Sequence, residues 1–195
     1  GTYGDNFDAT AARLAATLGL GDADLQRLRK LGIYINYNGY GAEIEDLHYA
    51  PDVLFQRLHP YADPRDFIAD DEAYDALEQG YHDDMRRARA VRPEVEDDHA
   101  AVYRLPAEPW ARRVGGVYAN LLAGDAPERA HALLTESPEG GFVVSVRAPL
   151  TTRTGADALC RQFPTGGGRQ AAAGINALPE DQLEVFVDRF RAAFG

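Results

Sequence analysis

The stretch "FPTGGGRQAAAGIN", residues 163–176, places three glycines before an arginine, a glutamine and three alanines. Because glycine has no Cβ, such a run allows a tight turn that no side chain could enter. Consecutive backbone N–H groups that lead into a helix can also hold an anion, with Arg169 as a fork-shaped donor to phosphate oxygens. We therefore predict a turn over Gly166, Gly167 and Gly168 followed by a short helix, and we expect Gly167→Val to be strained.

The segments on either side of this run have the pattern of an α/β domain. Short apolar stretches at 99–105, 130–137 and 141–149 predict strands, and "PEGG" at 138–141 predicts the turn between the last two. Helices are expected over 108–124, with an interruption at Gly115 and Gly116, and over 155–163 and 179–194. We predict a C-terminal α/β domain over 100–195, with a mixed sheet flanked by helices.

The N-terminal half reads as a helical segment, over residues 1–92. Leucines at helical spacing predict two helices between residues 9 and 35, and "INYNGYG" at 35–41 predicts a helix stop with packed tyrosines rather than a ligand site. A short helix is expected within 50–64, and a longer acidic helix over 70–90 carries Tyr74, Leu77 and Tyr81 on one face. The polar stretch "RPEVEDD" at 92–98 is the best candidate for a linker.

Composition limits the classes of function. With 195 residues and 45% hydrophobic residues the chain can bury a real core, and its apolar runs are too short to span a bilayer. The net charge of −11 argues against broad attraction to nucleic acid, although Arg147, Arg153, Arg161 and Arg169 gather in the C-terminal part. A single cysteine, Cys160, fits a reducing compartment, so we expect a cytoplasmic location and no membrane partner. The first residue is Gly1 rather than methionine, which suggests a fragment.

The glycine run fits neither G-x-x-x-x-G-K-[ST] nor G-x-G-x-x-G, but together with its neighbours it resembles another signature. The strand "VVSVRAP", a helix and "FPTGGGRQAAAG" are similar to the DHH-associated domain of the DHH phosphoesterase superfamily, where a strand with serine and arginine precedes GGGH-x-x-AAG. The opening "GTYGDNFDATAARLAATLGL" resembles the segment of RecJ-like members in which G-T-x-x-D supplies an aspartate to a two-metal site. The resemblance implies that 1–92 is the end of a DHH catalytic domain plus a helical connector, and that 100–195 is the substrate-binding or nucleic-acid-binding DHH-associated domain.

The resemblance also implies roles for individual residues. Asp5 corresponds to a ligand of a Mn²⁺ pair, and the matched substrate side consists of Ser145, Arg147, Gly166, Gly167, Gly168 and Arg169. The family's other metal-binding motifs would lie upstream of Gly1, and one carboxylate cannot hold a metal pair. Arg169 stands where the family usually has histidine, and a guanidinium binds phosphate but neither ligates a metal nor exchanges a proton near neutral pH.

Three functions remain open at this point. The first is the C-terminal portion of a metal-dependent phosphoesterase that acts on phosphodiester or nucleotide substrates, with a short oligonucleotide, nucleotide or other phosphate ester as partner. The second is a non-catalytic nucleotide- or oligonucleotide-binding module. The third is an acyl-CoA acyltransferase, because "RRVGGV" from Arg112 approaches the pyrophosphate loop [RQ]-x-x-G-x-[GA] but ends on Val117. The sequence leaves open whether this chain is an enzyme, which substrate it takes and its oligomeric state, a homodimer included.

The remaining reactive side chains favour structural roles. The five histidines form no H-x-x-x-H or H-E-x-x-H pattern, and we assign none to a metal. Cys160 follows Leu159 on an apolar helix face, which predicts a buried thiol rather than a nucleophile.

Overall fold

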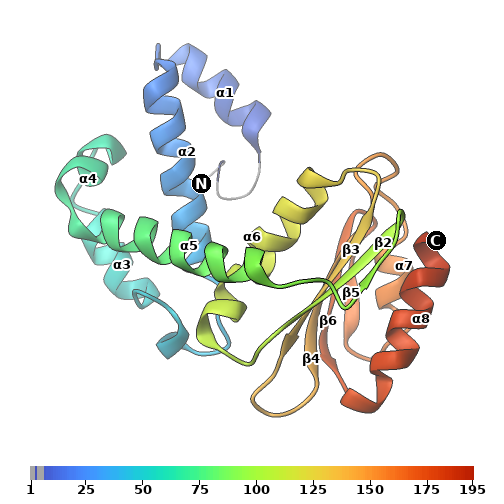
Figure 1. Cartoon of the computed structure of the whole chain (residues 1–195). Coiled ribbons are helices and arrows are strands. Elements are labelled where there is room, and N and C mark those ends of the chain that lie inside the picture. Colours follow the sequence, from blue (N-terminus) through green and yellow to red (C-terminus); the bar gives the residue numbers. More distant parts are fainter. Residues whose placement is uncertain (1–2, 4–6) are drawn as a thin grey trace. The chain divides into compact units, whose positions relative to one another are not determined.

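The computed structural model describes residue 3 and residues 7–195, and it divides the chain into two compact units (Figure 1). Unit 1 is Gly1–Asp84 and unit 2 is Met85–Gly195, so helix α5 (Glu72–Ala90) crosses the boundary. The sequence of unit 1 has 6 Lys and Arg against 17 Asp and Glu, whereas unit 2 has 14 of each. The whole net charge of −11 therefore belongs to unit 1.

Unit 1 is helical, as its sequence predicts. Its elements are α1 (Asp8–Thr17), α2 (Asp22–Tyr37), a 3₁₀ turn η1 (Ile44–Asp46), α3 (Pro51–Leu58), α4 (Pro64–Asp70) and most of α5. Prolines begin α3 and α4, where the missing N–H has no intrahelical partner to lose. Among the described residues no helix is long and apolar enough to pass through a bilayer. The core is formed by α2, α3, α4 and α5 through Leu31, Tyr34, Leu54, Phe67, Ala73, Tyr74 and Leu77.

The end of α2 confirms the predicted helix stop. Tyr37 is fully buried. The next residue, Asn38, is also buried, and its side chain makes hydrogen bonds. Its Nδ2 donates to the carbonyl oxygen of Tyr49 at 2.7 Å, and its Oδ1 accepts from the backbone N–H groups of His48 and Tyr49. Asn38 thus closes the loop that follows α2. Tyr40, which we expected to pack, is instead 42% exposed.

Unit 2 contains a mixed six-stranded sheet with the strand order β1-β2-β3-β4-β6-β5. The strands are β1 (Val95–Glu96), β2 (Ala100–Leu105), β3 (Ala130–Glu136), β4 (Phe142–Arg147), β5 (Gly166–Arg169) and β6 (Ala172–Leu178). Only β2 and β3 are parallel, and helix α6 (Pro109–Asp125) connects them as the crossover that parallel strands require. This architecture confirms the predicted α/β fold with a mixed sheet flanked by helices.

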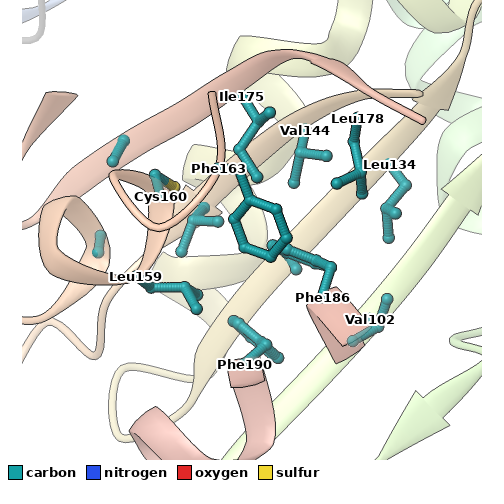
Figure 2. Packing of buried hydrophobic residues seen from close by; sticks show 14 of the residues in the cluster. Val102, Leu134, Val144, Leu159, Cys160, Phe163, Ile175, Leu178, Phe186 and Phe190 are labelled. Carbon is teal, nitrogen blue, oxygen red and sulfur yellow. The ribbon is translucent and has the colours of Figure 1, made fainter. Parts of the chain in front are cut away.

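The two faces of the sheet pack against different helices. Helix α7 (Ala156–Cys160) and helix α8 (Leu183–Phe194), which follows a 3₁₀ turn η2 (Glu180–Gln182), pack against one face. Figure 2 shows this core, in which Phe163 and Phe186 lie beside strand residues such as Val144 and Ile175. Cys160 is buried within it, as predicted. Helix α6 contacts β3 and β4 from the other face and continues without a break through Gly115 and Gly116, where we expected an interruption.

Candidate functional site

The glycine run forms an edge strand, so the predicted turn before a helix is wrong. Gly166–Arg169 is strand β5, which pairs antiparallel with β6 after a tight connection through Gln170 and Ala171. Ala172 and Ala173, which favour a helix locally, instead lie in β6, which is bonded to β5 on one side and to β4 on the other. Two ladders of backbone hydrogen bonds thus outweigh helix propensity, which amounts to less than about 1 kcal/mol per residue. Within the described residues, the glycine run therefore does not lead into a helix N-terminus that could attract an anion.

The sheet register nevertheless brings four of the six candidate residues onto one face, whereas Gly166 and Gly168 are in register with the core residues Ile175 and Ala173. Across β6, Arg147 of β4 and Arg169 of β5 both pair with Ala172. One row further along, Ser145 and Gly167 pair with Gly174 in the same way. Directly opposed residues in antiparallel strands point to the same face, so both rows share one face. Two strand spacings, roughly 10 Å, separate the Cα atoms of the two arginines, a span that two arginine side chains can close around one phosphate group.

Between the two arginines, the surface of this face is formed by residues with a small side chain or none. Gly167, Ala172 and Gly174, which we call the glycine shelf, lie half-buried on β5 and β6. Helix α6 packs on the same face over β3 and β4, where Arg147 contacts it. The glycine shelf lies next to the part of this face that α6 covers. Ser145 and Arg147 lie along one side of the shelf and Arg169 lies on the other.

The fold requires three of the neighbouring glycines but not Gly167. A Cβ on Gly166 would lie 1.7 Å from the carbonyl oxygen of Cys160, and one on Gly174 would lie 2.7 Å from that of Val144. Gly168 has a φ of +139°, which side chains rarely adopt. A Cβ on Gly167 would meet no atom within 4 Å, and its φ lies outside the left-handed region. The expected strain in Gly167→Val is therefore wrong, and packing within the described residues gives no reason for a glycine here.

The two arginines are held differently. Arg147 Nε donates to Asn120 Oδ1 on α6 at 2.8 Å, and Arg147 Nη1 donates to the carbonyl oxygen of Val146 at 3.2 Å. The guanidinium of Arg169 is exposed, and within residues 7–195 it makes no hydrogen bond or ion pair. The half-buried Ser145 hydroxyl likewise has no hydrogen-bond partner in that range. Asn120 was missed because only the folded β-α-β arrangement brings it to Arg147, and its sequence context carries no signal.

Further positive charge lies at the end of the sheet where Arg147 and Arg169 stand. The backbone N–H groups of Ala148 and Ala156 donate to the carbonyl oxygens of Ala171 and Gln170, at 3.1 and 3.0 Å. These bonds hold the loop that follows β4 against the β5–β6 connection. The loop carries Arg153, whose Nε donates to the carbonyl oxygen of Leu150. A neutral unit can thus present a locally cationic end.

His131 of β3 lies beside Arg147 in the register. It is 2% exposed, and burial, reinforced by Arg129, lowers its pKa to about 4. The side chain is therefore neutral near pH 7 and does not compete with the arginines for an anion.

The metal prediction concerns a residue that the structure does not describe. Asp5 lies outside the described residues. Within them, no group of three or more His, Cys, Asp or Glu side chains could hold a metal ion. The residues present do not supply the several ligands of a catalytic metal pair, and Asp5 as a ligand stays a prediction.

The acyl-CoA alternative is wrong on structural grounds. The "RRVGGV" motif at 112–117 lies inside α6, and Val114 within it is fully buried. Interior helical N–H groups already bond to carbonyl groups of the preceding turn, so they cannot form a pyrophosphate loop.

Comparisons with known proteins find likeness in structure only. No protein-family model matches the chain, and no curated protein sequence matches it. A manganese-bound exonuclease RecJ aligns with a TM-score of 0.56 and 20% identity, over 83% of this chain and 39% of that one. RecJ from Thermus thermophilus in complex with Mn²⁺ aligns with a TM-score of 0.50 and 17% identity, over 92% of this chain and 34% of that one. An exopolyphosphatase-related protein from Bacteroides fragilis aligns with a TM-score of 0.45 and 18% identity, over 75% of this chain and 44% of that one.

This chain thus spans well under half the length of the RecJ chains it matches. The helical unit and the mixed sheet follow one another in the order that the motifs predicted. The chain therefore has the fold of the C-terminal part of RecJ, a member of the DHH phosphoesterase superfamily, which confirms at the level of the fold the resemblance seen in its motifs.

Proposed function

We propose that residues 100–195 bind the phosphate of a nucleotide or short oligonucleotide, as the substrate-binding portion of a DHH-type metal-dependent phosphoesterase. The observation that carries this proposal is the pair Arg147 and Arg169, which lie on either side of Ala172 at the open glycine shelf. Arg147 is positioned in advance by Asn120, whereas Arg169 has its donors available within the described residues. Such charge-assisted bonds are short and strong, and a fork-shaped guanidinium suits phosphate oxygens.

The shape of the shelf favours a small, flat ligand. Gly167 and Gly174 leave the backbone bare, so a sugar or base can lie close to the sheet while its phosphate meets the arginines. The Ser145 hydroxyl can donate to a phosphate oxygen or accept from a sugar hydroxyl. A net charge of −11 opposes the approach of a long polyanion, so a two- to five-nucleotide RNA should bind better than a long duplex.

Hydrolysis is a further proposal about the complete protein. It would require Mn²⁺ held by Asp5 together with ligands that the described residues do not supply. We therefore expect this chain to bind nucleotide without metal-dependent turnover of a chromogenic phosphodiester. The alternative function, a binding module without catalysis, predicts the same behaviour for this chain. The two functions predict different results only when another segment supplies the missing metal ligands, because only the phosphoesterase would then hydrolyse the substrate. A cytoplasmic location remains a prediction from the single cysteine.

The test compares variants that leave the fold intact. Arg169→Ala should weaken binding of the short RNA about 10- to 100-fold, the loss expected for one bond of roughly 1.5–3 kcal/mol to a charged group. Gly167→Val should weaken it similarly by filling the shelf. Both variants should keep the thermal stability of the parent chain. Isothermal titration calorimetry at several salt concentrations measures the affinities, and thermal unfolding measures the stability.

Two matched controls separate the site from general effects. Arg92→Ala removes an exposed arginine elsewhere in unit 2, and Asn176→Val adds the same side chain at an exposed position of β6. Both should bind RNA like the parent chain. Unchanged RNA binding in Arg169→Ala and Gly167→Val, or tighter binding of the duplex than of the short RNA, would show that the site is misplaced.

A further inference from the structure

Unit 1 contains a separate hollow between three helices. It has a volume of about 530 Å³ and is lined from α2 by Gln26, Arg27 and Lys30, and from the other helices by Ile68 of α4 and Tyr74 and Glu78 of α5. All of these residues belong to unit 1. This volume lies within the range of small-molecule sites, roughly 300–1,000 Å³.

Two of the charged side chains that line the hollow, Lys30 and Glu78, neutralise each other. Lys30 Nζ lies 3.1 Å from Glu78 Oε1, and the Tyr34 hydroxyl donates to the same oxygen at 2.9 Å. Burial alone would raise the pKa of Glu78, but these two hydrogen bonds outweigh burial and lower it. Glu78 is therefore ionised and paired, and it does not require a cation from outside.

Arg27, which precedes Lys30 by one helical turn on α2, is the exception among the charged residues of the lining. Unit 1 holds 17 acidic side chains against 6 basic ones, so an arginine there has many carboxylates to choose from. Arg57 and Arg65 each bond two acidic side chains. Within residues 7–195, however, Arg27 makes no hydrogen bond or ion pair. The lining of the hollow therefore carries one uncompensated positive charge in an otherwise acidic unit.

The rest of the lining suits an organic group. Tyr74 is buried with only 7% of its surface exposed, and Ile68 is half-buried beside it, so the floor is apolar. Gln26 adds an amide that can donate to an anion and accept from a hydroxyl. An anionic head over Arg27 and a planar ring over Tyr74 and Ile68 would satisfy both parts of the hollow.

We infer that this hollow binds a phosphate monoester with a planar ring, at a site separate from the glycine shelf. The ligand's phosphate lies on the Arg27 guanidinium and its ring lies on the Tyr74 side. This binding does not depend on the proposed function of unit 2, because no residue of the shelf takes part.

The probe is adenosine 5′-monophosphate, titrated into the whole chain carrying Arg169→Ala so that the shelf is disabled. We expect saturable binding, with NMR shift changes at the amides of Tyr74 and Ile68. Adding Arg27→Ala should weaken binding at least about 10-fold, the loss of one good charged hydrogen bond. Adenosine, which lacks the phosphate, should bind as weakly to the parent as the nucleotide does to Arg27→Ala.

The control is Arg13→Ala, which removes an exposed arginine of α1 outside the hollow. This variant should bind the nucleotide like its parent. The inference is overturned if the Arg169→Ala chain does not bind the nucleotide, if Arg27→Ala leaves the affinity unchanged, or if the shift changes fall outside unit 1. Failure of the proposed function gives a different result: in a chain with intact Arg27, the affinity for the short RNA would not change on Arg169→Ala.

Discussion

Gly166 and Gly167 are neighbours in one strand, yet the structure predicts opposite effects of alanine at the two positions. A Cβ at Gly166 would lie 1.7 Å from the Cys160 carbonyl oxygen, well inside the limit of 3.0 Å below which real Cβ contacts are essentially absent. The strand or the carbonyl must therefore move by more than 1 Å. That carbonyl accepts a hydrogen bond from the N–H of Phe163 at 3.0 Å, so movement also endangers this bond. A Cβ at Gly167 meets nothing within 4 Å.

These contacts set the expected magnitudes. Overpacking costs about 1–3 kcal/mol, and an unsatisfied buried carbonyl adds about 1–3 kcal/mol. Gly166→Ala should therefore lower the free energy of unfolding of unit 2 by about 2–6 kcal/mol, a large part of the roughly 5–15 kcal/mol of a typical domain. Gly167→Ala should raise it by about 0.4–1 kcal/mol, because alanine restricts the unfolded chain at a position whose native backbone it can adopt.

Unit 2 provides its own reporter for this measurement. The single tryptophan, Trp110, is buried in α6 and donates from Nε1 to Glu108 at 2.7 Å, so its fluorescence follows unfolding of this unit. Urea unfolding of both variants and the parent chain gives the free energies by linear extrapolation. Equal stabilities of the two variants, or a Gly166→Ala chain within about 0.5 kcal/mol of the parent, would refute the packing described for β5.

Two further predictions concern buried titratable groups. The folded pKa of His131 is about 4 against an ordinary 6.5, so between these values the unfolded chain binds the extra proton. The stability of unit 2 should therefore fall as the pH drops from 6.5 towards 4, by up to about 1.4 kcal/mol per pH unit, and His131→Asn should reduce this slope in urea titrations; identical slopes would contradict the burial of His131. Burial also raises the pKa of Cys160 to about 11, so a chromogenic disulfide reagent should label this thiol only when unit 2 unfolds. Rapid labelling of the folded chain would disprove that.

Most elements of this fold could be predicted because their signals are local. Tyr74 and Leu77 recur at helical spacing, and both are buried on one face of α5. Strand β4, which follows "PEGG", alternates between buried and less buried residues, and the turn before it supplies two glycines at positive φ. In each case the residues that determine the element also belong to it.

The glycine run failed as a prediction for the opposite reason. Nothing in "GGGRQAAAG" is β-branched or aromatic, so strand propensity is low throughout, and the alanines favour a helix. The run becomes a hairpin because β4 is available to pair with β6. In addition, the carbonyl oxygen of Cys160 lies so close to position 166 that only glycine fits there. Both causes lie outside the run. The candidate residues were chosen by resemblance to a motif, and their role in binding stays a prediction.

The net charge of the whole chain alone would suggest a protein that repels polyanions. However, the charges are distributed unevenly between the two units. The excess of carboxylates belongs to unit 1, and unit 2 is neutral with several arginines at one end of its sheet. Contacts with a bound phosphate act over a few ångströms, whereas exposed charges beyond about 8 Å are largely screened at physiological salt. Under the proposed function, a mononucleotide on the shelf should therefore respond mainly to Arg147 and Arg169. A long duplex would reach far beyond these two residues and meet the field of the whole chain, so we expect the acidic composition to limit the length of the ligand without preventing binding of a phosphate at the proposed site.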